Sequence, residues 1–334
     1  MHDRVFTQIG RTTPLPLLPV LLPLIALGAC TAEGSDAEAD PADAVGPESL
    51  WAGGPELWFA SLAADETGAP LLGSGRNVTR RPGYDNQPKF FPDGTVLYTR
   101  QEDERTDIWR YHPADDRHTP VTETPDRSEY SPTPTPDGGV SAIVVEPDSM
   151  QRLWRYALDG TDPVVLFREI APVGYHAWAN ETDAFLFVLG SPATLQRASF
   201  SGDDATPEGG GIPGEGEILD EGIGRSLNRV PGREAVSYPK SGGDGKVTIR
   251  IRDAATGSVT DEFLSGIAPQ DHAWTPSGWV LYGQGHRLMA FDPSSEDAAP
   301  HLAGALPDSS LVISRLAVSD DGASIVLVVE RPRE

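Results

Sequence analysis

A short pattern of turn residues, followed by an apolar run, returns along this chain at an almost constant interval. It is clearest at Pro92-Asp93-Gly94, Pro136-Asp137-Gly138 and Asp320-Asp321-Gly322. Gly94 and Gly138 are 44 residues apart, and so are Gly278 and Gly322. An Asp-Gly pair between two apolar runs supplies the positive-φ residue of a tight hairpin. A hairpin unit at a fixed period predicts a repeat fold, in which each unit packs against its neighbours.

Weaker copies and a second set of strands complete the series. Thr182 and Pro231-Gly232 stand where the hairpin pattern is degenerate. Between the hairpins lie six further strand-like segments, for example Ile108 to Tyr111 and Leu153 to Tyr156. A period in the forties with four strands per unit is the spacing of propeller blades. The chain begins with an inter-hairpin strand and ends with a hairpin pair, so its two ends should complete one blade. We therefore predict an all-β, six-bladed β-propeller of four-stranded antiparallel blades over residues 51–334, as a single domain.

The repeat also resembles a known family. Phe90-Phe91-Pro92-Asp93-Gly94, an apolar strand, and then Asp107-Ile108-Trp109-Arg110-Tyr111 are similar to the repeat of TolB-like six-bladed β-propellers. Tricorn-type and prolyl-oligopeptidase propellers carry the same repeat. The resemblance covers nearly all of the chain after residue 50 and implies a propeller that binds protein partners. The motif is specific for the fold and carries little information on function.

The N-terminal region has the features of a targeting signal. Leu15 to Ala29 is an apolar run of 15 residues, whereas a spanning helix needs about 20. We therefore predict a signal peptide over residues 1–29. Its end, Leu27-Gly28-Ala29-Cys30, resembles the lipobox of bacterial lipoproteins, in which the cysteine carries the acyl chains. Residues 30–50 are acidic and lack basic side chains, as a disordered tether does.

The resemblance to lipoproteins implies a location. Cys30 is the sole cysteine of the chain, and it stands at the lipidation position. The membrane partner would be reached through this lipid anchor. Thr31 follows the cysteine, and by resemblance to lipoprotein sorting it permits delivery to the outer membrane. We expect a lipid-anchored protein of the bacterial cell envelope, at the outer membrane and facing the periplasm or the surface.

Charge and motifs exclude several function classes. The chain has 26 Lys and Arg against 50 Asp and Glu, a net charge of −24. A nucleic-acid partner needs a basic footprint, so none is expected. The Gly-x-Ser-x-Gly elbow, the Walker A motif, His-Glu-x-x-His and the EF-hand loop are all absent from the sequence. We assign no catalytic residue, no metal ligand and no cofactor.

Five tryptophans recur along the chain together with the repeat. We expect them at equivalent strand positions in the packing between blades: Trp58, Trp109, Trp154, Trp178 and Trp274.

The candidate binding residues come from the position of two histidines in the repeat. His176 and His272 each stand six residues before the hairpin position of their blade. The first strand of each blade lines the channel in this fold, so both should lie near its mouth. The preceding position in each repeat is mostly polar. The resulting candidates for a channel-mouth site are Gln87, Tyr175, His176, Asp271, His272 and Arg315, with Ser131 and Ser226 in the same ring.

Three interpretations of the histidines remain open: a structural bond to the backbone of a neighbouring blade, a contact to a peptide or other ligand, or part of a metal site with Asp271. The leading hypothesis for function is a non-catalytic propeller that binds an envelope protein or peptide. The alternative is a propeller hydrolase or lyase acting on peptide or polysaccharide, with or without the assistance of a metal.

Overall fold

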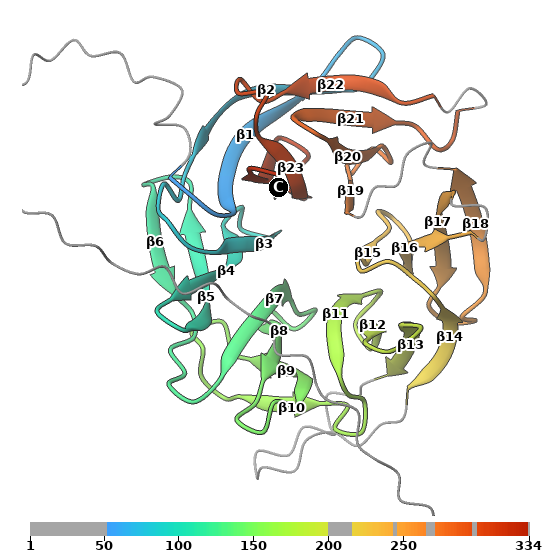
Figure 1. Cartoon of the computed structure of the whole chain (residues 1–334). Helices are drawn as coiled ribbons and strands as arrows, with labels where there is room; N and C mark the ends of the chain where they lie inside the picture. The colour runs from blue at the N-terminus through green and yellow to red at the C-terminus, as the bar shows by residue number, and fades with distance from the viewer. Residues whose placement is uncertain (1–51, 200–215, 243–245, 265–270, 296–298, 333–334) are drawn as a thin grey trace, which may run out of the picture. The chain divides into compact units, whose positions relative to one another are not determined.

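The computed structural model describes residues 52–199, 216–242, 246–264, 271–295 and 299–332. The predicted signal peptide, the lipobox with Leu27, Gly28, Ala29 and Cys30, and the tether lie outside these ranges. The described residues form six antiparallel sheets of four strands around a central channel (Figure 1). The prediction of an all-β, six-bladed propeller is confirmed.

Each blade runs outward from an innermost strand that lines the channel (Figure 1). Blade 1 contains β3 (Asp85–Phe90), β4 (Val96–Glu102), β5 (Arg105–His112) and β6 (Arg117–Pro120). Blade 2 contains β7 (Ser128–Pro134), β8 (Val140–Val145), β9 (Gln151–Tyr156) and β10 (Val164–Leu166). Blade 3 contains β11 (Val173–Trp178), β12 (Asp183–Val188), β13 (Thr194–Ser199) and β14 (Glu217–Glu221).

The second half of the ring repeats this order. Blade 4 contains β15 (Asn228–Arg229), β16 (Ala235–Ser241), β17 (Val247–Asp253) and β18 (Val259–Leu264). Blade 5 contains β19 (His272–Trp274), β20 (Val280–Gln284), β21 (Arg287–Phe291) and β22 (His301–Ala305). Blade 6 contains β23 (Val312–Val318), β24 (Ser324–Glu330), β1 (Glu56–Ala64) and β2 (Pro70–Asn77).

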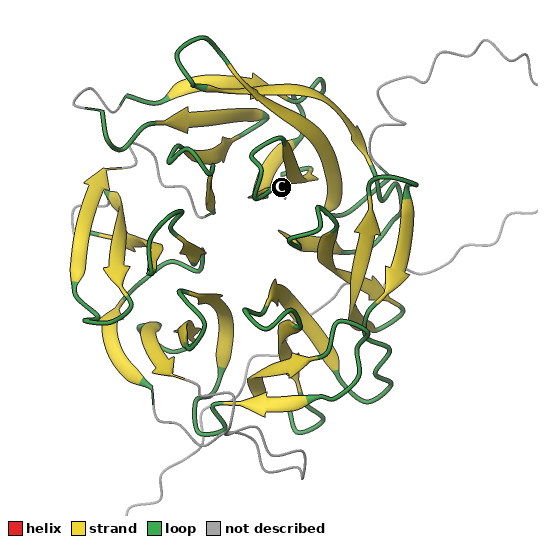
Figure 2. Cartoon of the chain, turned by 180° about the vertical axis from the view of Figure 1, so that it is seen from behind, coloured by secondary structure: helices red, strands yellow, loops and turns green. Residues whose placement is uncertain are grey.

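Blade 6 joins the two ends of the described chain, as the sequence predicted. β1 pairs with β24 over six residue pairs, from Glu56 opposite Val329 to Ser61 opposite Ser324. This pairing closes the ring and gives both β1 and β24 a paired strand on each side. Seen from the opposite side, the described ranges consist of strands and loops (Figure 2). They hold no helix that is long and apolar enough to cross a membrane.

The hairpins that define the repeat have the expected backbone. The glycines at this position in blades 1, 2, 4, 5 and 6 all have φ between +69° and +92°. Blade 3 lacks this glycine, and a side chain replaces it. The Asn180 carboxamide oxygen accepts hydrogen bonds from the amides of Thr182 at 2.9 Å and Asp183 at 2.7 Å. An asparagine can close a turn in this way, which explains why the repeat survives without the Asp-Gly pair.

The hydrophobic core lies between adjacent blades. Along β24, Ile325 and Leu327 pack against blade 5, whereas Val326 and Val328 pack against blade 1. This alternation follows from the two-residue period of a strand with both faces buried. The expectation of equivalent tryptophans was wrong in part. Trp58, Trp109 and Trp154 lie on the third strands of their blades, whereas Trp178 and Trp274 lie on innermost strands.

Candidate functional site

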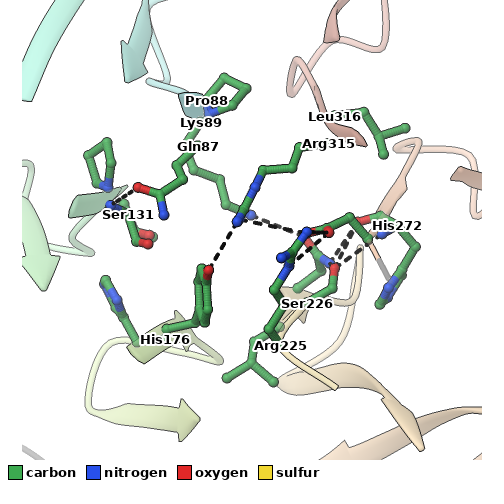
Figure 3. Close-up of a pocket in the computed structure, with 16 residues that line it drawn as sticks. Gln87, Pro88, Lys89, Ser131, His176, Arg225, Ser226, His272, Arg315 and Leu316 are labelled. Atoms are coloured by element: carbon green, nitrogen blue, oxygen red, sulfur yellow. Dashed lines mark hydrogen bonds and ion pairs between the residues drawn. The ribbon is translucent and has the colours of Figure 1, made fainter. Parts of the chain in front are cut away.

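The innermost strands bring the predicted ring together around one cavity of about 60 Å³ (Figure 3). Gln87 comes from β3, Tyr175 and His176 from β11, and Arg315 from β23. Asp271 precedes β19, which begins at His272. The six candidates therefore come from four blades. Ser131 and Ser226 line the same cavity from blades 2 and 4.

Two of these positions have strained backbone. Gln87 and Ser131 adopt φ values of 57° and 52°, in the left-handed region that non-glycine residues rarely occupy. Each lies in an irregularity of the pairing between the two innermost strands of its blade. The Gln87 carboxamide oxygen accepts hydrogen bonds from the Ser131 amide and the Thr99 hydroxyl, both at 2.8 Å. Hydrogen bonds between blades 1 and 2 thus hold Gln87 and Ser131 in a backbone conformation that is unfavourable for non-glycine residues.

A charged layer crosses the channel next to this cavity. The Arg225 guanidinium donates to one carboxylate oxygen of Asp271 through Nε at 3.0 Å and Nη2 at 2.6 Å. Arg315 approaches the other Asp271 oxygen at 3.8 Å and donates to the Tyr175 hydroxyl at 3.0 Å. Tyr175 belongs to blade 3, opposite blade 6 that carries Arg315 (Figure 1). Asp271 is therefore neutralised by two arginines.

Lys89 crosses the channel in the same manner. Its ammonium donates to the Asn228 carboxamide oxygen at 3.0 Å, from blade 1 to the opposite blade 4. The Asn228 amide group in turn donates to the His272 carbonyl at 2.8 Å. Burial lowers the pKa of Lys89 to about 8, with nearby Arg315 acting in the same direction and Asp271 opposing it.

His176 is held by the neighbouring blade. Its side chain is 4% exposed, and Nε2 lies 2.7 Å from the Ser141 hydroxyl of β8 in blade 2. The Trp178 indole donates to the same hydroxyl at 2.9 Å. Burial, together with the charge of Lys89, lowers the pKa of His176 to about 3.

His272 repeats this arrangement between blades 4 and 5. Its Nε2 lies 2.8 Å from the Ser237 hydroxyl of β16, to which the Trp274 indole also donates at 2.8 Å. Burial and Lys89 again lower the pKa, to about 3. Each histidine is thus bonded to its neighbouring blade, through a serine side chain rather than the backbone. In the described ranges, no group of three or more His, Cys, Asp or Glu side chains could hold a metal ion.

A wider vestibule of about 560 Å³ adjoins the cavity. Arg225, Asp271 and Arg315 line both spaces, so the charged layer stands between them. The vestibule is lined by the first residues of β23, whereas Leu316, the residue after Arg315, lines the cavity. Tyr84 forms part of its wall, and burial raises the pKa of this tyrosine to about 12.

The sequence reasoning did not identify three cavity-lining residues that make these contacts: Lys89, Arg225 and Asn228. Lys89 is one of only three lysines in the chain and lies two residues after Gln87, on the same predicted innermost strand. That rarity was a usable signal. The sequence also contains a signal for the two serines that bond the histidines. Ser141 and Ser237 are 96 residues apart, as are His176 and His272.

Comparison with known proteins supports the fold. No family model and no curated protein matches this chain. Among solved structures, putative TolB from Agrobacterium tumefaciens matches with a TM-score of 0.59 at 16% identity, over 84% of this chain and 99% of that one. TolB from Acinetobacter baumannii matches at 0.51 and 12%, over 83% of this chain and 64% of that protein.

A gluconolactonase from Xanthomonas campestris also matches, with a TM-score of 0.53 at 12% identity, over 81% of this chain and 95% of that one. The same architecture therefore occurs in proteins of different function. At these identities the likeness concerns the fold alone. The chain is a six-bladed β-propeller that is similar in structure to the TolB propellers.

Proposed function

We propose that this protein is a non-catalytic propeller of the bacterial cell envelope, anchored by a lipid on Cys30, which binds a protein or peptide at its channel mouth. The observation that carries the proposal is the vestibule with its charged layer. A space of about 560 Å³ falls within the range of ligand pockets, roughly 300–1,000 Å³. It is large enough for a segment of extended polypeptide.

The side chains at the vestibule favour recognition of a peptide. Tyr84 stands on its wall, and Arg225 and Arg315 stand at its inner end. Tyrosine and arginine are enriched among the residues that dominate binding energy at protein interfaces. The arginine pair is already fixed by Asp271 and Tyr175, so a ligand would meet a preorganised surface.

A propeller hydrolase or lyase is the second candidate, and one observation favours it. Lys89, with a pKa of about 8, is close to the value that suits a general base. The two imidazoles are poorly suited to that role, because a pKa of about 3 makes them weak bases. A general base at residue 89 must be lysine, whereas a charged binding group there could be arginine. Turnover lost in the Lys89→Arg variant would therefore favour the enzyme.

Photo-crosslinking should separate a binding vestibule from an inert one. We expect a benzophenone amino acid at position 84 to form a discrete adduct when cells are irradiated, because a bound segment would lie against this wall. The same amino acid at Leu302, on the exposed outer strand of blade 5, should form none. Arg225→Gln should weaken the adduct at position 84 several-fold. Equal adducts from both positions would contradict the proposal.

Membrane association should depend on Cys30. We expect the wild-type chain to sediment with membranes and to stay there in 1 M salt, because the acyl chains hold it by burial in the bilayer. The Cys30→Ser variant should move to the soluble fraction. A chain with net charge −24 has no electrostatic attraction to anionic lipid that could replace the anchor. An unchanged distribution would rule out the lipidation.

A further inference from the structure

The guanidinium of Arg315 is largely buried, and the described chain does not give it a carboxylate of its own. Its side chain is 13% exposed and makes one hydrogen bond among the described residues, from Nη2 to the Tyr175 hydroxyl at 3.0 Å. Its ion pair is with Asp271, where Nη1 lies 3.8 Å from Oδ1, too far for a hydrogen bond. A guanidinium carries five N–H donors, so four of those of Arg315 have no acceptor within the described ranges.

The carboxylate of Asp271 is bound more closely by the other arginine. Arg225 donates to Asp271 through two nitrogens, at 3.0 and 2.6 Å, and so takes up most of its charge. Lys89 lines the same cavity as a third cation, close enough to Arg315 that the two charges repel each other. Three cations therefore face one carboxylate. Buried cations without counter-charges are costly and favour the entry of an anion.

The free donors can be reached from the vestibule. Arg225 and Arg315 line both the cavity and the vestibule, and Figure 3 shows both reaching into the channel. Their nitrogens are absent from the set of buried, unpartnered polar atoms of the described chain, so those without an acceptor are open to solvent. Burial raises the pKa of Tyr84 on the vestibule wall, and the charges of Arg315 and Arg225 oppose that rise. The hydroxyl of Tyr84 therefore lies within the field of both arginines.

A second carboxylate at the vestibule does not supply the missing charge. Glu330 stands at the end of β24 and forms no ion pair with any residue that the structure describes. The charged residues of the vestibule lining leave one net positive charge: Arg225, Arg315 and Arg331 against Asp271 and Glu330. In a chain of net charge −24, the channel mouth is thus a local reversal of sign.

We propose that Arg315 binds a carboxylate of the ligand, so that the channel mouth selects acidic peptides. The planar guanidinium matches a carboxylate with two parallel hydrogen bonds. Tyr175 already fixes the position of Arg315, through its hydroxyl and through its ring, whose centre lies 5.2 Å from the guanidinium carbon. Little side-chain entropy is then lost on binding. This inference rests on the proposed function, since it names the chemical group that a peptide in the vestibule presents.

Two blocked peptides test the charge requirement: acetyl-Ala-Glu-Ala amide and acetyl-Ala-Gln-Ala amide. Their central side chains have nearly the same shape and differ in charge. In NMR titrations at constant ionic strength, we expect the full wild-type chain to bind the glutamate peptide about tenfold more tightly, as a charge-assisted hydrogen bond warrants. This comparison does not depend on a variant that folds. Equal affinities, or no binding of either peptide, would overturn the proposal.

The Arg315→Gln variant should abolish this preference, with binding of the glutamate peptide weakened about tenfold and that of the glutamine peptide unchanged. Asp271 keeps its two bonds from Arg225 in this variant, so we expect the propeller to fold, which circular dichroism would check. Arg287→Gln removes the same charge at an exposed position of β21 and should leave the preference intact. A preference that survives in Arg315→Gln would contradict the role of Arg315.

A third peptide, acetyl-Ala-Ala-Ala with a free carboxylate, separates the two sources of the group. Tighter binding of this peptide than of the glutamate peptide assigns the site to a chain terminus, and the reverse order assigns it to an acidic side chain. The crosslink at position 84 separates the inference from the function on which it rests. A crosslink without preference for the glutamate peptide would overturn the carboxylate assignment alone. A preference without a crosslink would support the carboxylate site and overturn the binding of a cellular protein or peptide.

Discussion

Between pH 6.5 and pH 4, the wild-type protein should lose stability relative to a variant in which His176 and His272 are both glutamine. The native pKa of each imidazole is about 3, against 6.5 for the free side chain. Below pH 6.5 the unfolded chain therefore takes up protons that the native state refuses, and the native state loses free energy. At about 1.4 kcal/mol per pH unit, each histidine accounts for up to roughly 3 kcal/mol by pH 4.

Urea unfolding at several pH values measures this difference. Glu129 and Asp85 act in the opposite direction, because burial raises their native pKa values to about 7 and about 6, so their carboxyls favour the native state as pH falls. Both are present in wild type and variant, and their contributions cancel in the comparison. His286→Gln, at the β20–β21 hairpin, serves as the control for losing a histidine outside the cavity. Parallel pH profiles for wild type and the double variant would show that the two imidazoles do titrate in the native state.

Leu327→Ala should destabilise the propeller by about 2–5 kcal/mol, the usual cost of truncating a fully buried leucine. Leu327 is 0% exposed and packs from β24 into the core between blades 5 and 6. The same strand pairs with β1, so the void left by the smaller side chain would weaken the contact that closes the ring.

Leu302→Ala offers a matched control, since Leu302 is 53% exposed on β22. This change should stay within about 0.5 kcal/mol of wild type. Chemical denaturation followed by tryptophan fluorescence measures both variants. If the two substitutions lower the free energy of unfolding equally, the core beneath the β1–β24 pairing does not contribute specially to stability.

Much of the fold could be predicted because its signals are local. An Asp-Gly pair closes a hairpin through the backbone freedom of one residue; the period of the hairpins gives the size of a blade, and the number of copies gives the number of blades. The ring around the channel followed from the same counting, which placed Gln87 and Arg315 on equivalent strands. Blade 3 shows the limit of such reading, because Asn180 replaces the glycine by a side-chain bond that the repeat pattern does not contain.

The details of the site depend on contacts between blades, which no local pattern contains. Ser141 meets His176 across a blade interface, and Lys89 meets Asn228 across the whole channel. Both contacts depend on how six sheets are tilted about a common axis. A charge count could identify Lys89 as unusual, but its partner lies 139 residues away in the sequence.

The pairing of β1 with β24 also constrains the order in which the chain can fold during its synthesis. β1 emerges from the ribosome long before its partner β24, because Glu56 pairs with Val329. Until β24 has been made, this edge of β1 has no native neighbour, and unpaired edges are where chains associate wrongly. The ring can therefore close only after β24 has been made, and until then the edge of β1 is open to incorrect pairing.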